Sequence, residues 1–180
     1  MNNITKKLHI KRVILILIMV LWMCVIFCLS GQNSDESSST SSIFVNVVVE
    51  LFEKIINKQL SVENVDTLTY VIRKLAHLTL YFILSIPTLL LFKTYNINIK
   101  RKYIYTILFC FVYACSDELH QIFSQGRNGN VIDILIDTTG SIVGIVFIQI
   151  VSNLVCKSSN RRNINECNWY TSYGDGGYRT

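Results

Sequence analysis

The run VIDILIDTTGSIVGIVFIQIVSNLV, at residues 131–155, decides the fold class of this chain. A helix of about 20 apolar residues crosses the hydrocarbon layer of a membrane, and this run reaches that length. It must be helical there, because lipid offers no hydrogen-bond partners to the edges of strands. The run therefore predicts a membrane protein.

Three further runs, at residues 13–29, 70–92 and 103–123, are candidate spans of the same kind. The run at 103–123 is long enough only if its polar last turns continue the same helix. The run at 13–29 follows basic residues, as a signal peptide or a membrane anchor would, and Ser30 could mark a cleavage site. Its length favours a retained anchor. The predicted fold is all-α: a polytopic membrane protein with four transmembrane helices in one domain, residues 13–155.

Basic residues predict the orientation of these helices. Twelve of the 17 Lys and Arg residues lie before the first span, between the second and third, or after the fourth. Cytoplasmic segments of membrane proteins carry this excess of basic residues. We therefore expect a multi-pass protein with both residues 1–12 and the C-terminus in the cytoplasm.

Two segments outside the spans have patterns of their own. Residues 43–60 follow a Ser-rich linker and place apolar residues at helical spacing with charges mostly opposite. They predict an amphipathic helix on the outer face of the membrane. Residues 156–180 have no apolar periodicity, so we expect a disordered cytoplasmic tail.

The cysteines and the net charge argue against other classes of protein. Four of the 6 cysteines lie inside apolar runs and no CxxC spacing occurs, so neither a zinc site nor a disulfide framework is indicated. The net charge of +5 comes from residues that flank apolar runs and do not form a stripe with aromatics. This arrangement argues against nucleic-acid binding. The expected partner is membrane lipid.

Polar residues in the fourth span form one narrow stripe. Asp133, Asp137, Gly140 and Gly144 fall at offsets of 4, 7 and 11, which is one face of a helix with 3.6 residues per turn. Charges inside a membrane are costly and normally face other protein groups. The glycines allow another helix to approach closely beneath the two carboxylates. We expect this stripe to face the interior of the bundle.

The second span carries the stretch RKLAHLTLY near its outer end. Arg73 and His77 share a helix face, which Tyr81 joins less closely, and Lys74 lies to one side. This face points a cation and an imidazole toward the centre of the predicted bundle.

The third span ends in DELHQ. Asp117, His120 and Gln121 share a face, whereas Glu118 points about a third of a turn away and can reach the following loop. Three helices thus bring polar residues to the outer end of the bundle.

The loop SQGRNGN adds Arg127 to this outer end. Its glycines permit a sharp turn into the fourth span, with Asn130 as the N-cap. The fixed cations of the cluster nearly balance its carboxylates, so at least some of these charges should be paired.

Two interpretations of the cluster remain open. It is either a structural ion-pair network that fixes helix register, or a site that binds a ligand. A metal held by His120, Asp117 and Asp133 is a weaker form of the second interpretation, because no histidine spacing of the HExxH kind occurs. We assign no metal and no cofactor from the sequence.

Three blocks form a characteristic set: VIFCLSGQ at 25–32, RKLAHLTLYFIL at 73–84, and DELHQIFSQGRNGNVIDILIDTTGSIVG at 117–144. They resemble the VanZ-like family of membrane proteins, and the last block is specific. Position 31 is Gly where the family often has Ser. The family is named for an accessory protein associated with resistance to the glycopeptide teicoplanin. The resemblance therefore implies a role at the bacterial cell envelope.

The resemblance also marks the characteristic positions of the family. In this sequence they are Ser30, Gln32, Lys74, His77, Tyr81, Asp117, Glu118, Gln121, Arg127, Asp133, Asp137 and Gly140. Arg73 and His120 join them from the helix faces described above, and Gly144 joins them as a packing position.

We expect a non-catalytic protein of the bacterial cell membrane, whose outer cluster binds an anionic headgroup or a lipid-linked cell-wall precursor. Arg73, Lys74 and Arg127 would donate to it, since guanidinium groups suit phosphate. An intramembrane hydrolase or transferase on a lipid-linked substrate is the alternative, although no pattern such as GxSxG supports it. A small transporter is less attractive without an internal repeat. The sequence leaves the oligomeric state open.

Overall fold

The computed structural model of the chain describes residues 3–30, 62–123 and 130–159, with a few isolated positions between 47 and 54. Its long helices are α1 (Asn3–Ser30), α3 (Val62–Lys93), α4 (Ile99–Ile122) and α5 (Val131–Ser159). No described residue lies in a strand. The prediction of an all-α fold is confirmed.

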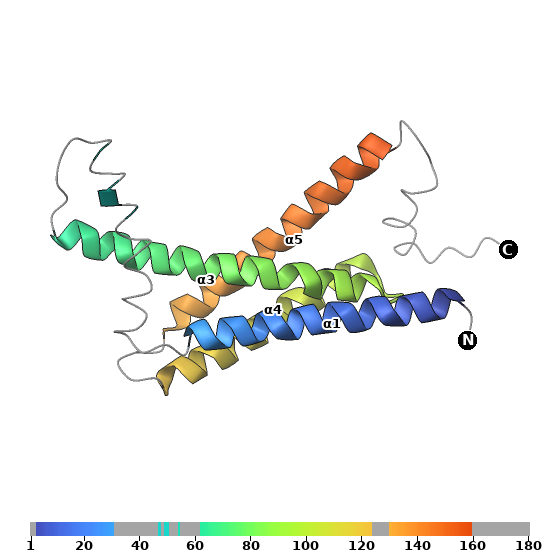
Figure 1. The fold of residues 1–180 in the computed structure, drawn as a ribbon, viewed down its shortest axis with the longest axis horizontal. Coiled ribbons are helices and arrows are strands. Elements are labelled where there is room, and N and C mark those ends of the chain that lie inside the picture. Colours follow the sequence, from blue (N-terminus) through green and yellow to red (C-terminus); the bar gives the residue numbers. More distant parts are fainter. Residues whose placement is uncertain are drawn as a thin grey trace.

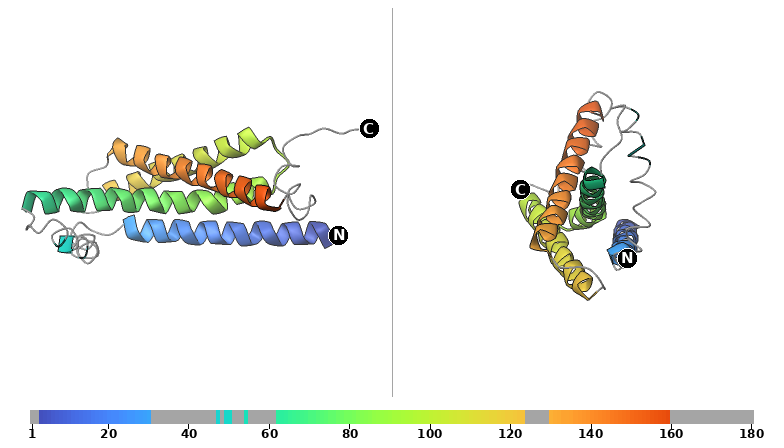
Figure 2. Two further views of the ribbon diagram at one scale, coloured as in Figure 1. Left: turned by 90° about the horizontal axis from the view of Figure 1, so that it is seen from above. Right: turned by 90° about the vertical axis from the view of Figure 1, so that its left-hand side faces the viewer.

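The helices alternate in direction along the bundle. α1 and α3 lie side by side and antiparallel, α4 returns beside them, and α5 crosses α3 obliquely (Figures 1 and 2). Because of this alternation, the end of α1, the first half of α3, the end of α4 and the start of α5 meet at one end of the bundle. We call it the polar end, and in Figure 1 it lies on the left.

Side-chain contacts also connect the helices at the opposite end. Arg12 of α1 donates from Nε to Thr94 Oγ1 at 3.1 Å and from Nη2 to Thr94 O at 2.8 Å. Its guanidinium lies 4.2 Å from the centre of the Tyr95 ring, a cation–π distance. Between α4 and α5, Tyr103 Oη donates to Gln149 Oε1 at 2.5 Å. The start of α1, the α3–α4 connection and the later part of α5 are therefore anchored away from the polar end.

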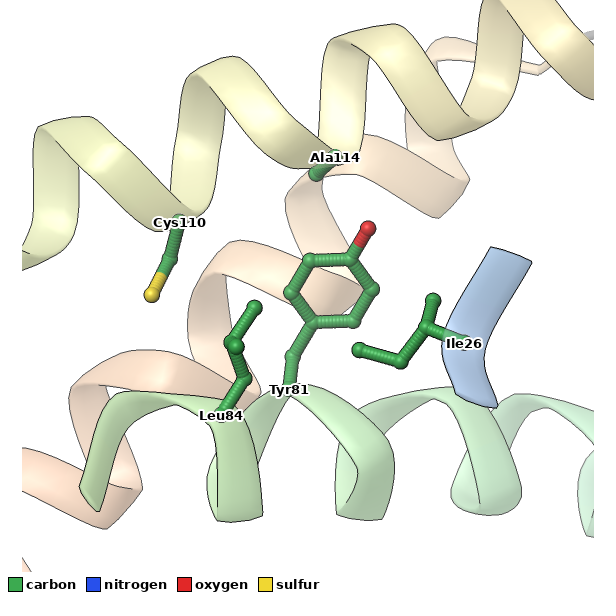
Figure 3. Close-up of a cluster of buried hydrophobic side chains, with 5 residues drawn as sticks. All are labelled: Ile26, Tyr81, Leu84, Cys110 and Ala114. Atoms are coloured by element: carbon green, nitrogen blue, oxygen red, sulfur yellow. The ribbon is translucent and has the colours of Figure 1, made fainter. Parts of the chain in front are cut away.

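A small apolar core lies between α1, α3 and α4. Figure 3 shows Ile26, Tyr81, Leu84, Cys110 and Ala114 packed together, each at most 1% exposed. These side chains come from three helices, so the core depends on α1 as well as on the later helices.

Two hydrogen bonds fasten α1 to the same core. Trp22 Nε1 donates to Leu80 O of α3 at 2.9 Å, and Tyr113 Oη of α4 donates to Met23 O at 2.6 Å. A buried indole or phenol normally finds such a partner, because its polar atom would otherwise lose its hydrogen bonds to water.

Three of the helices are long and apolar enough to cross a membrane: Ile4–Ser30, Val62–Lys93 and Val131–Cys156. Large apolar side chains face outward on them, such as Leu21 at 68% exposure and Leu154 at 62%. Patches of this extent are unusual on a soluble monomer and would be covered by lipid in a membrane. The chain is a membrane protein by these criteria together.

α4 is more polar than the other helices. It nevertheless runs without interruption through Asp117 and Glu118, and its C-cap is Phe123. The prediction that the polar stretch continues the helix is confirmed.

The helices extend beyond the predicted spans. α1 begins at Asn3 rather than at 13, and α3 begins at Val62 rather than at 70. Hydropathy marks only the part suited to hydrocarbon, whereas the backbone hydrogen bonds of a helix continue equally well through polar residues. α5 likewise runs to Ser159, so the first residues of the predicted disordered tail are helical.

Two predicted segments fall largely or wholly outside the described residues. They are the amphipathic helix at 43–60, of which only isolated positions are described, and the tail from residue 160 onward.

Candidate functional site

The polar end is built on the close approach of α3 and α5. A methyl group on the α-carbon of Gly140 would lie 2.2 Å from Leu78 O, and one on Gly144 would lie 2.1 Å from Ser85 Oγ. Only glycine fits at such distances, so the stripe predicted from the sequence packs against α3. The crossing brings the carboxylates of α5, one and two turns before Gly140, to the side of α3.

Lys74 of α3 forms an ion pair with Asp133 of α5. Both side chains are about one-fifth exposed, at 21% and 19%, so the pair is partly shielded from solvent. The Lys74 ammonium also lies 4.9 Å from the centre of the Tyr70 ring. This pair joins α3 and α5 on the side of the glycine crossing where α5 begins.

The side of α3 that faces α5 differs from the expected one. Lys74 was predicted to lie to one side and Arg73 to point inward, but Lys74 makes the contact. The contacts with α5 fall at Lys74, Leu78, Phe82 and Ser85, and offsets of 4, 8 and 11 define one helical stripe. Arg73 lies beside this stripe, half-buried, and forms no hydrogen bond or ion pair among the described residues.

His77, Asp117 and Asp137 converge from three helices. One potential ligand atom from each lies within 4.8 Å of the others. Asp137 is 2% exposed, and its Oδ1 lies 3.8 Å from His77 Nδ1, which is too long for a hydrogen bond. Periodicity placed each residue on an inward face, but it could not show that these three would meet.

Asp117 is the best-connected member of this group. Ser30, the last residue of α1, donates from Oγ to Asp117 Oδ1, and Gln121 Nε2 donates to Asp117 Oδ2 at 3.2 Å. Asp117 is 2% exposed, so these bonds replace the water that a carboxylate would otherwise bind. They also fix the orientation of the carboxylate between α1 and α5.

Glu118 points away from this group and reaches the start of α5. Its Oε1 accepts a hydrogen bond from the backbone N–H of Asn130. Asn130 Oδ1 in turn accepts from Ile132 N at 3.1 Å, which is the N-cap arrangement expected from the sequence. A carboxylate next to a helix N-terminus is favourable, because the unpaired N–H groups give that end a partial positive charge.

Tyr81 lies at the inner edge of the group. Its side chain is fully buried, and no described residue forms a hydrogen bond with its hydroxyl. Figure 3 shows the hydroxyl directed away from α3, toward α4 near Ala114. Ala114 lies one helical turn before Asp117 on α4, so the hydroxyl points toward the part of α4 that carries this carboxylate.

His120 takes a different role from the one considered for it. Its ring packs on Phe27 of α1, with the ring centroids 4.0 Å apart and the planes 31° apart. Because Asp133 is paired with Lys74, the metal set considered from the sequence (His120, Asp117 and Asp133) is not brought together among the described residues. Gln32 and Arg127 lie outside the described residues.

The polar cluster, as we use the term below, consists of Ser30, Lys74, His77, Tyr81, Asp117, Glu118, Gln121, Asp133 and Asp137. Chemically it offers an imidazole, hydroxyls, an ion pair and buried carboxylates at the end of a membrane bundle.

Comparison with known protein families identifies a relationship. The family model VanZ/LLP1 matches residues 15–152. This range contains the whole polar cluster and more than half of each of the four long helices. No curated protein and no solved structure matches the chain.

Proposed function

The chain belongs to the VanZ/LLP1 family, and we propose that it is a four-span protein of the bacterial cell membrane whose polar cluster binds an anionic headgroup. The headgroup would be carried by a membrane lipid or by a lipid-linked cell-wall precursor. Such binding would contribute to glycopeptide resistance, the role for which the family is named.

Arg73 carries this proposal. It is half-buried, it precedes the ion-paired Lys74, and no described residue satisfies its guanidinium. A guanidinium presents several donors in a planar fork that matches the oxygens of a phosphate. In the proposed orientation, such a cation would meet a phosphate at headgroup depth.

Packing supports a fourth span at α4. α4 contacts α1 through the Tyr113–Met23 hydrogen bond and the Ser30–Asp117 hydrogen bond, so the second half of α4 lies beside the last turns of α1. Its most polar side chains, Asp117 and Glu118, are 2% and 6% exposed and would not face lipid. A helix with this burial can cross a membrane despite its modest hydropathy.

We propose that the polar end faces outward and that both termini lie in the cytoplasm. The basic segments near Arg12, Lys100 and Arg101 support this orientation, because they lie at the opposite end of the bundle. Cys156 is an argument for the opposite orientation of the C-terminus, because it forms a disulfide and disulfides persist mainly in oxidising compartments.

A pair of reporter fusions after Thr180 separates the two orientations. A fluorescent protein that matures only in the cytoplasm should be bright, and alkaline phosphatase, which is active only outside, should be inactive. The opposite pair of results would place the C-terminus outside and would reverse the bundle.

The proposed role is tested by the susceptibility of cells that express the protein. Arg73→Ala should restore teicoplanin susceptibility to that of cells without the protein, while its level in the membrane stays unchanged. Arg101→Ala is the matched control, because Arg101 is an exposed arginine at the opposite end of the bundle. Equal resistance with Arg73→Ala and the wild type would contradict the proposed role.

A further inference from the structure

We propose that His77, Asp117 and Asp137 form a site for a divalent cation of the zinc and manganese class, and that this cation holds the phosphate of the headgroup. Its part in headgroup binding rests on the function proposed above, whereas binding of the cation itself does not. The three residues come from α3, α4 and α5, so the site exists only in the folded bundle.

The donor set suits such a cation. One imidazole and two carboxylates are ligands for Zn²⁺ and Mn²⁺, whereas Ca²⁺ prefers six or more oxygen ligands. At Zn–N and Zn–O bonds of about 2.1 Å, tetrahedral ligand atoms lie roughly 3.4 Å apart. The three atoms here lie within 4.8 Å of one another, so small side-chain rotations bring them to that spacing.

The fully buried Tyr81 hydroxyl is an independent indication of a ligand. It has no hydrogen-bond partner among the described residues, and it is directed toward α4 near Ala114, one helical turn before Asp117 (Figure 3). A buried hydroxyl without a partner is unfavourable, and most such groups in proteins are satisfied. A cation between Asp117 and Asp137, with the water or phosphate oxygen that it carries, would supply that partner.

The surroundings of the site are those of a supported metal centre. Ser30 and Gln121 each donate to one oxygen of Asp117, and such contacts orient a ligating carboxylate. A carboxylate oxygen has two lone pairs, so it can accept a hydrogen bond and ligate a cation at the same time. The His77 side chain is 22% exposed, which opens a path for the ion from the polar end.

A cation also resolves the charge balance of the cluster. Four carboxylates lie there (Asp117, Glu118, Asp133 and Asp137). Among the described residues the fixed cations are Lys74, which is paired with Asp133, and Arg73, which lies beside the cluster. Even with Arg127 added, carboxylates outnumber fixed cations and would repel a phosphate. A divalent ion reverses this excess, and three protein ligands leave a fourth position open for a phosphate oxygen.

The direct test is metal binding by the purified full chain in nanodiscs of zwitterionic lipid, with any affinity tag removed. After treatment with a chelator and dialysis, the protein is titrated with Zn²⁺ alone or Mn²⁺ alone. We expect about one ion per chain by elemental analysis and a higher unfolding temperature with the ion bound. A wild-type protein that binds neither ion would overturn the site, whatever the variants do.

Matched variants assign the ligands. Asp137→Asn and His77→Ala should weaken binding of the ion by more than tenfold. His120→Ala should bind like the wild type, because that histidine packs on Phe27 at the same end of the bundle. Wild-type affinity in both Asp137→Asn and His77→Ala would also overturn the site. A variant that elutes from a size-exclusion column as a single species in the absence of metal is taken as folded.

A second titration separates the cation site from the proposed function. Polyprenyl phosphate is added to the ion-loaded protein and to the chelator-treated protein, and we expect tight binding only with the ion. Zn²⁺ binding without any phosphate binding would leave the cation site standing and refute headgroup binding. Equal phosphate binding with and without the ion would support headgroup binding and refute the role given to the cation.

Discussion

Gly140 of α5 lies directly against the backbone carbonyl of Leu78 of α3, because a methyl group on its α-carbon would be 2.2 Å from Leu78 O. The helices cross at this point, and the polar cluster lies on the side of the crossing where α5 begins. The distance between the carboxylates of α5 and the basic residues of α3 therefore depends on the absence of a side chain at residue 140.

Gly140→Ala should force the two helices apart. We expect a loss of about 2 kcal/mol or more in the free energy of unfolding, since overpacking against rigid backbone costs about 1–3 kcal/mol. Thermal unfolding in nanodiscs measures it. Thr139→Ala is the control, because the neighbouring Thr139 is exposed and bonds only to its own helix. Equal unfolding temperatures for Gly140→Ala and the wild type would show that the crossing is looser than described.

The Lys74–Asp133 ion pair predicts coupling between the two positions. Lys74→Ala and Asp133→Ala should each destabilise the protein, and the double variant should lose less than the sum of the two. We expect a coupling of about 1 kcal/mol for this partly exposed pair, measured by a double-mutant cycle on unfolding free energies. Strict additivity would mean that the pair does not join α3 to α5.

Ser30→Ala should destabilise the polar end, because Asp117 would lose a hydroxyl donor in a buried position. A hydrogen bond to a charged group is worth about 1.5–3 kcal/mol, and thermal unfolding measures its loss. Ser116→Ala serves as the comparison, since Ser116 is exposed and donates only to Tyr113 O of its own helix. If both variants unfold like the wild type, α1 does not contribute a donor to the cluster.

Much of the polar end follows from the sequence alone. The offsets between Asp133, Asp137, Gly140 and Gly144 define one face of a helix, and that face packs as expected. The connections from α3 to α4 and from α4 to α5 are short and make these helices antiparallel, which brings the polar residues of α3, α4 and α5 to one end of the bundle. The deviation of Glu118 toward the loop also follows from its position on the helix.

Periodicity cannot supply the rest, because it identifies a face and not the neighbour that covers it. The sequence did not show that α3 receives the glycine stripe, and this choice decides that Lys74 rather than Arg73 meets Asp133. Nor could it show that His77 meets Asp117 while His120 packs on Phe27. Those contacts depend on the oblique crossing of α5, which the side chains of two helices determine jointly.

Binding of a polyprenyl phosphate to the purified, Zn²⁺-loaded protein in nanodiscs, with the uncharged polyprenol as the comparison lipid, tests the central claim most directly. We predict that the phosphate binds saturably and at least tenfold more tightly than the polyprenol. Arg73→Ala should weaken binding of the phosphate about tenfold, since a tenfold change corresponds to the loss of one charge-assisted contact of about 1.4 kcal/mol. Equal binding of the two lipids by the wild type would contradict the account, because the polar cluster would then not recognise an anionic headgroup.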